Sequence, residues 1–138
     1  MSPKLLAIAA CLALATPAYA HDPGETVKQN FAQAIPNIPG KSLVAVEVTY
    51  PPAGTSLPHH HANSAFIYAY VVSGVIESQV EGEPARAYHA GESWYEAPGA
   101  HHLESRNASK TKPAKLLAVF VVDTDDKKLT TYDQEKTK

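Results

Sequence analysis

Turn-forming residues divide the apolar part of this chain into short segments, and this division restricts its fold more than any other feature. Clusters of glycine and proline recur at roughly eight- to twelve-residue spacing between Pro51 and Gly99. The segments between them are rich in β-branched and aromatic residues, which favour strands. No alternation of strand-like and helix-like segments is evident, so a parallel sheet is not expected. The sequence therefore predicts an all-β sandwich or small antiparallel barrel.

Three segments carry the strongest strand signals. Ser42–Tyr50 alternates valine with other residues, as a half-buried strand does. Ser64–Ser73 is apolar on both faces and is expected to be a central strand, and Lys115–Asp123 is the last strong strand. Shorter strands are expected at Val75–Glu81, Arg86–His89, Ser93–Glu96 and His102–Asn107.

The ends of the chain differ in character from this centre. Lys4 followed by an apolar stretch and Ala18-Tyr19-Ala20 has the pattern of a cleaved secretory signal, so Met1–Ala20 is interpreted as a signal peptide. Residues 21–41 are then an N-terminal arm, in which Val27, Phe31 and Ile35 recur at helical spacing and favour a short helix over Glu25–Ala34. Residues 42–124 form the barrel, and residues 125–138 a charged, frayed tail.

Charge and cysteine content exclude several functions. The formal net charge is −2, and no run of Lys or Arg is present, so neither nucleic acid nor a membrane surface is an expected partner. Cys11 is the only cysteine and lies within the predicted signal, which excludes a disulfide scaffold and a cysteine zinc site. The mature protein is expected to be secreted or periplasmic and free of thiols.

Five of the seven histidines lie in two clusters, His59-His60-His61 and His101-His102. On a strand, residues two apart project from the same face, so His59 and His61 can converge while His60 faces away. Two imidazoles on one strand and a third from elsewhere form a metal site with open positions. A solvated surface run is the competing interpretation.

The surroundings of both clusters resemble the two motifs of the cupin superfamily, over about Leu43 to Val122. The first motif has a glycine, His-x-His, a glutamate and a second glycine; the second motif has a glycine, Pro-x-Gly, a histidine and an asparagine. The matching residues of the first are Gly54, His59-His60-His61 and Gly74. Those of the second are Gly91, Ala97-Pro98-Gly99, His102 and Asn107. The resemblance implies an antiparallel, jelly-roll-like β-barrel with a metal in its mouth.

The resemblance also implies the metal ligands, with one gap. Carried over position by position, they are His59, His61 and His102, whereas His60 and His101 fall at other places. The motif glutamate is missing: its place falls on Ile67, and residues 62–72 contain no carboxylate. Gln79 on the next strand is a possible replacement, and Tyr68 and Tyr70 are weaker ones. Glu96 and Glu104 flank the second cluster, either orienting an imidazole or lying in solvent.

Three neutral imidazoles predict a divalent transition metal. Nitrogen ligands favour zinc, copper, nickel or ferrous iron over magnesium, calcium or manganese. Without a carboxylate the ion retains its full charge and should acidify a bound water strongly.

Two classes of function remain open for this site. The first is a metal-dependent enzyme of dioxygenase, isomerase or lyase type that acts on a small molecule in the barrel mouth. The second is a protein that binds a metal or small ligand without turnover. The resemblance does not decide between them, because one fold hosts many functions. The acids expected near the metal are Glu77 and Glu96, and a homodimer is one option for the assembly.

The signal sequence gives a first prediction. Exported protein should begin at His21 and should react with no thiol reagent, because Cys11 leaves with the signal. Intact-mass measurement of exported protein tests this. A retained Met1, or a lipid attached to Cys11, would show that the cleavage site is misassigned.

Overall fold

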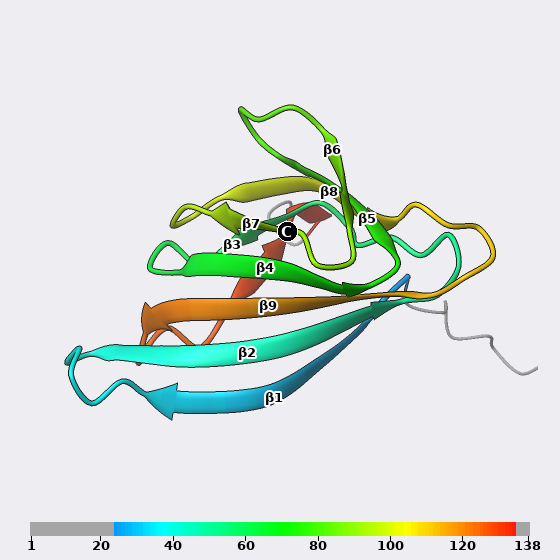
Figure 1. Cartoon of the computed structure of the whole chain (residues 1–138). Coiled ribbons are helices and arrows are strands. Elements are labelled where there is room, and N and C mark those ends of the chain that lie inside the picture. The colour runs from blue at the N-terminus through cyan, green and yellow to red at the C-terminus, as the bar shows by residue number, and fades with distance from the viewer. Residues whose placement is uncertain (1–23, 135–138) are drawn as a thin grey trace, which may run out of the picture.

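Two antiparallel sheets of five strands each make up the computed structural model, which describes residues 24–134 (Figure 1). The first sheet has the order β1-β2-β9-β4-β7 and the second β10-β3-β8-β5-β6. The strands are β1 Thr26–Ala34, β2 Lys41–Tyr50, β3 His59–His61, β4 Phe66–Ser73, β5 Val75–Val80, β6 Arg86–His89, β7 Ser93–Glu96, β8 His101–Asn107, β9 Ala114–Asp123 and β10 Thr130–Tyr132.

The longest pairing joins β2 to β9 in the middle of the first sheet. It runs without a register shift from Lys41 opposite Asp123 to Tyr50 opposite Ala114. Both strands turn alternate residues inward, and β4 pairs along the other side of β9. The buried core between the sheets is formed mainly by side chains of these three strands, including Val46, Val48, Ile67, Ala69, Val71, Leu116 and Phe120.

This architecture confirms the predicted all-β, jelly-roll-like barrel. Along β2 and β9, more buried and less buried residues alternate because only one face of each strand meets the core. No helix of the described residues is long and apolar enough to cross a membrane. The predicted signal, Met1–Ala20, lies outside the described residues.

The predicted helix over Glu25–Ala34 is wrong, because Thr26–Ala34 form the edge strand β1. Val27 and Phe31 are half exposed, so their helical spacing does not mark a buried face. The backbone instead pairs with the open edge of β2, from Thr26 opposite Thr49 to Ala34 opposite Ser42. The register shifts between Gln29 and Phe31, and the two strands are paired on both sides of this shift.

The predicted frayed tail is partly wrong as well. Thr130–Tyr132 forms β10, which pairs with β3 and places Thr130 opposite His61 and Tyr132 opposite His59. The histidine strand β3 is therefore covered on both edges, by β10 on one side and β8 on the other. The charged residues that suggested fraying precede and follow this short strand.

Candidate metal centre

Strand β3 presents His59 and His61 to the interior and His60 to the outside, as its alternation predicts. The backbone pairing of β3 with β8 places His102 directly opposite His59. The rings of His59 and His61 meet edge to face at 4.7 Å, and His102 is tilted against both. One nitrogen from each of the three rings lies within 4.8 Å of the other two.

Hydrogen bonds decide which nitrogen each ring can offer. His59 Nδ1 lies 2.7 Å from the carbonyl oxygen of Leu57 and donates to it, which leaves Nε2 with a lone pair. His102 Nε2 lies 2.8 Å from the hydroxyl of Ser78, which leaves Nδ1 facing the interior. The first sheet's Glu96 lies beside this nitrogen and beside Nε2 of His61.

The carboxylate of Glu96 is the main feature that the resemblance did not assign to the ligands. It lies at the end of β7, is only 3% exposed, and has Oε2 at 3.1 Å from His61 Nε2 and Oε1 at 3.3 Å from His102 Nδ1. Oε1 also accepts a hydrogen bond from Trp94 Nε1 at 3.1 Å. Oε2 has no hydrogen-bond partner among the described residues, because the approach of His61 lacks hydrogen-bond geometry.

Burial and charge together set the ionisation of the centre. Burial lowers the pKa of His102 to about 4, and the opposing attraction of Glu96 is weaker. Burial also lowers the pKa of His59. For Glu96, burial acts to raise the pKa, but the contacts with His61 and His102 outweigh it and lower the pKa to about 2. At neutral pH, His59 and His102 are therefore neutral and have lone pairs to donate, and Glu96 is a carboxylate.

Ile67 lines this cavity from β4, so the place of the missing motif glutamate does face the centre. The proposed replacement, Gln79, does not: its amide donates to the carbonyl of Glu83 on the outside, while Ser78 points inward. The prediction of Gln79 as a ligand is therefore wrong. Tyr68 and Tyr70 stack on each other and do not line the cavity.

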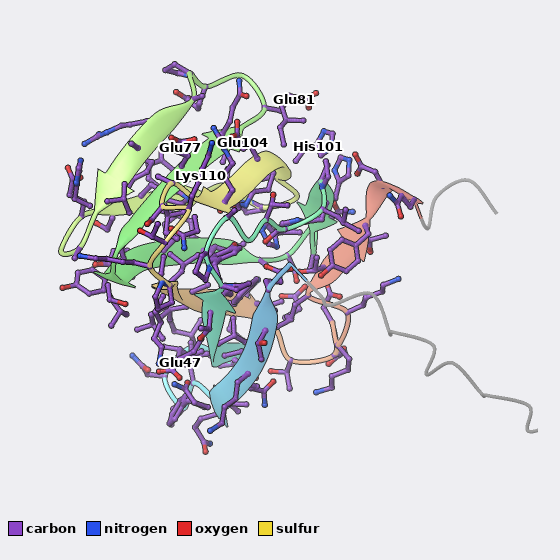
Figure 2. The ribbon with its side chains drawn as sticks, turned by 90° about the vertical axis from the view of Figure 1, so that its right-hand side faces the viewer. Glu47, Glu77, Glu81, His101, Glu104 and Lys110 are labelled. Atoms are coloured by element: carbon purple, nitrogen blue, oxygen red, sulfur yellow. The ribbon has the colours of Figure 1, made fainter. Side chains whose placement is uncertain are left out.

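The other acids that the sequence placed near the metal lie outside it. Glu104 and Glu77 both pair with Arg106 on the outer face of β5 and β8 (Figure 2). Of the three acids that the sequence placed near the metal, Glu96 alone reaches the inner histidines.

Glu25 is a second carboxylate of the cavity, and sequence analysis missed it because it assigned this residue to a helical arm. It accepts hydrogen bonds from the hydroxyls of Ser56 and Tyr132. Its position depends on a close backbone approach: a Cβ at Gly54 would lie 2.4 Å from the carbonyl oxygen of Gly24. Gly54, the first residue of the resembling motif, thus lets β1 bring Glu25 to the cavity.

A second histidine group lies on the opposite face of the same strands. His60, His101 and Asp133 have ligand atoms within 4.8 Å of one another, and His101 also lies 3.6 Å from Glu81 (Figure 2). The rings of His60 and His101 are stacked, with centroids 3.9 Å apart and planes 7° from parallel. Because an imidazole binds a metal in its ring plane, two parallel rings cannot share one ion in this arrangement.

The inner donor set fits a divalent transition metal. Three imidazoles with non-parallel planes converge on one point, two of them neutral through burial, and an ionised carboxylate oxygen without a hydrogen-bond partner lies beside them. The cavity at this point has a volume of about 80 Å³. Apolar side chains such as Leu116 and Phe120 form part of its remaining wall, and polar side chains such as Ser56 and Tyr132 form another part.

Comparisons with known proteins identify the family and the fold of this chain. The family model for the cupin domain matches residues 46–120. Among solved structures, an oxalate oxidase in complex with the substrate analogue glycolate has a TM-score of 0.63 at 21% identity, over 86% of this chain and 57% of that one. KdgF from Halomonas sp. has a TM-score of 0.58 at 23% identity, over 77% and 86%.

A third similar structure is the DMSP lyase DddQ from Ruegeria pomeroyi, with a TM-score of 0.55 at 21% identity, over 70% of this chain and 45% of that one. This chain spans little more than half the length of the oxalate oxidase structures. No curated protein matches the chain in sequence. At these identities the similar structures show the fold.

Beside Glu25, the hydroxyl of Tyr50 gives a prediction about pH. This hydroxyl is buried and hydrogen-bonded to Ser56 at 2.8 Å and Ser105 at 2.7 Å, and burial, with the charge of Glu25, raises its pKa. A raised pKa means that the fold favours the neutral phenol, so this stabilisation is complete below the unfolded pKa of about 10 and is lost above it.

Tyr50→Phe should therefore flatten the fall in the free energy of unfolding between about pH 9.5 and 11. At pH 7 it should cost about 1 kcal/mol through the lost hydrogen bonds. Urea unfolding over this pH range is the measurement, with exposed Tyr95→Phe as the control that keeps the wild-type slope. If Tyr50→Phe falls as steeply as wild type, Tyr50 does not stay neutral in the fold.

Proposed function

Because this chain belongs to the cupin superfamily, we propose that it is an exported protein that binds one divalent transition metal through His59, His61 and His102. The observation that carries the proposal is the convergence of three tilted imidazoles on the inner cavity, with nitrogens within 4.8 Å of one another. Zinc, iron, copper and nickel all suit imidazole ligands. The family alone does not assign a function to this site, because cupins host many functions.

The cavity limits what can bind beside the metal. Its volume of about 80 Å³ is far below the roughly 300–1,000 Å³ of sites for drug-sized ligands. A ligand within it has only a few non-hydrogen atoms. The apolar walls favour a compact carbon skeleton, and the metal favours a carboxylate or hydroxyl oxygen on it. A small organic acid meets these requirements, as does the substrate analogue glycolate in the similar oxalate oxidase.

We propose turnover of the lyase or isomerase type on such an acid. The bound metal would supply Lewis-acid polarisation of the acid's oxygen. Glu25 would accept the proton that leaves the reacting carbon of the acid, because its carboxylate lies on the cavity wall. Hydrogen bonds from Ser56 and Tyr132 would hold this carboxylate in place. Ile67 and Phe120 would keep water from the reacting carbon. Binding of a metal or small ligand without turnover is the second candidate.

Metal content tests the site. Protein purified without added metal, or reconstituted with zinc, should hold close to one ion per chain in the inner site. His61→Ala and His102→Ala should lose most of it, because each removes one of three protein ligands. His60→Ala should keep it, because that ring faces outward. Elemental analysis and titration measure the content, and an equal loss in His60→Ala and His61→Ala would contradict the assigned site.

The two candidate functions differ in their response to Glu25→Gln. If the protein is an enzyme, metal-loaded wild type should convert at least one small hydroxy- or keto-acid, followed by NMR. Glu25→Gln should retain its metal and lose about 10²–10⁴-fold in rate. Loss of rate without loss of metal supports a proton-transfer role. Binding of the acids without any conversion would instead favour the second candidate.

A further inference from the structure

We infer that Glu96 supplies the carboxylate ligand missing from the first motif, so that the fourth protein ligand comes from β7 instead of β4. This inference rests on the proposed metal site and adds to it one negatively charged ligand. The sequence left the site with three neutral ligands. The structure brings a carboxylate to it from a residue outside both histidine clusters.

The pairing of β4 with β7 explains how a carboxylate on β7 can take the place of one on β4. Ile67, at the place of the motif glutamate, is directly opposite Glu96 in the antiparallel pairing of β4 with β7. Directly opposite residues have Cβ atoms about 4.5–5.5 Å apart and project from the same face of the sheet. Both side chains line the inner cavity. A glutamate at either position therefore reaches the same space.

The distances match those of atoms that share a metal. Two metal bonds of about 2.1 Å, at the angles of octahedral or tetrahedral coordination, place the donor atoms about 3.0–3.4 Å apart. The Glu96 oxygens lie 3.1 Å from His61 Nε2 and 3.3 Å from His102 Nδ1. The first of these contacts is not a hydrogen bond, since Oε2 has no partner of suitable geometry.

The burial of Glu96 points to the same role. A carboxylate that is 3% exposed is costly unless charges or hydrogen bonds compensate it. Among the described side chains, Trp94 Nε1 is its one hydrogen-bond donor with good geometry. A divalent ion held by the histidines would compensate the buried charge completely.

A carboxylate ligand changes the expected choice of metal. Nitrogen ligands alone disfavour manganese, whereas an oxygen anion beside them raises the affinity for harder ions such as Mn²⁺ and Fe²⁺. It also lowers the net charge of the site from +2 to +1, which reduces the acidification of bound water relative to a site of three imidazoles. The selectivity between manganese and zinc is therefore a direct readout of Glu96.

The decisive experiment moves the carboxylate back to its motif position. Mn²⁺ and Zn²⁺ affinities of the full chain are measured by competition with a chromophoric chelator. Glu96→Gln should weaken Mn²⁺ binding at least about tenfold, and Zn²⁺ binding less. The double variant Ile67→Glu/Glu96→Ile should recover most of the Mn²⁺ affinity. The control Glu104→Gln, which alters a carboxylate on the outer face paired with Arg106, should bind both ions as wild type does.

Pulsed EPR of Mn²⁺-loaded protein in ¹⁷O-labelled water provides a second readout that does not depend on folding of the double variant. The first shell should contain one more labelled water in Glu96→Gln than in wild type, because water takes the place of the lost carboxylate oxygen. If Glu96→Gln leaves both affinities and this first shell unchanged, the inference is wrong, although the histidine site stands. If it weakens both metals equally and the shell is unchanged, Glu96 acts only through hydrogen bonds, and the inference is also wrong.

Failure of the underlying proposal has a different signature. His61→Ala serves as the reference for a lost ligand in every titration. If wild type and His61→Ala bind neither ion, the histidine site itself is contradicted, and the Glu96 variants will show no difference between metals.

Discussion

The structure depends on the burial of one negative charge between two sheets. Glu96 comes from the first sheet, and the imidazoles that face it come from β3 and β8 of the second. A buried carboxylate is stable only where its surroundings compensate it, so the positions of these strands are linked to its charge. Trp94, two residues earlier on β7, supplies a hydrogen bond that holds the carboxylate toward the histidines. A metal ion at this point would join the two layers of the sandwich and stabilise the folded state by mass action.

Local patterns predicted the histidine strand correctly, because alternation along a strand needs no knowledge of its neighbours. His59 and His61 face inward and His60 outward, and His102 lies across from His59. It was harder to predict which residues of a strand face inward when the strand has no clear alternation. In β5, Val75 and Ile76 are both apolar, so the sequence left the inward face open, and Ser78 occupies the place expected for Gln79.

The two cavity carboxylates were harder to assign because their positions depend on pairings between distant segments. Glu96 reaches the centre through the register of β7 with β4, which places it opposite Ile67. Glu25 reaches the cavity because β1, which follows it, pairs with the open edge of β2. The four-residue spacing of apolar residues in this segment had suggested a helix. Neither of these two strand registers can be predicted from the periodicity of a single segment. The missing glutamate of the first motif was the sequence feature that raised the question of a replacement ligand.

Together, the two proposals have His59, His61, His102 and Glu96 bind the same ion. A crystal structure of the metal-loaded full chain, with anomalous data at the metal edge, tests this most directly. We predict one strong anomalous peak in the inner cavity, within about 2.0–2.2 Å of one nitrogen from each of the three rings and of one Glu96 oxygen. A peak between His60 and His101 alone, or an inner peak with Glu96 turned away and water in its place, would contradict the account.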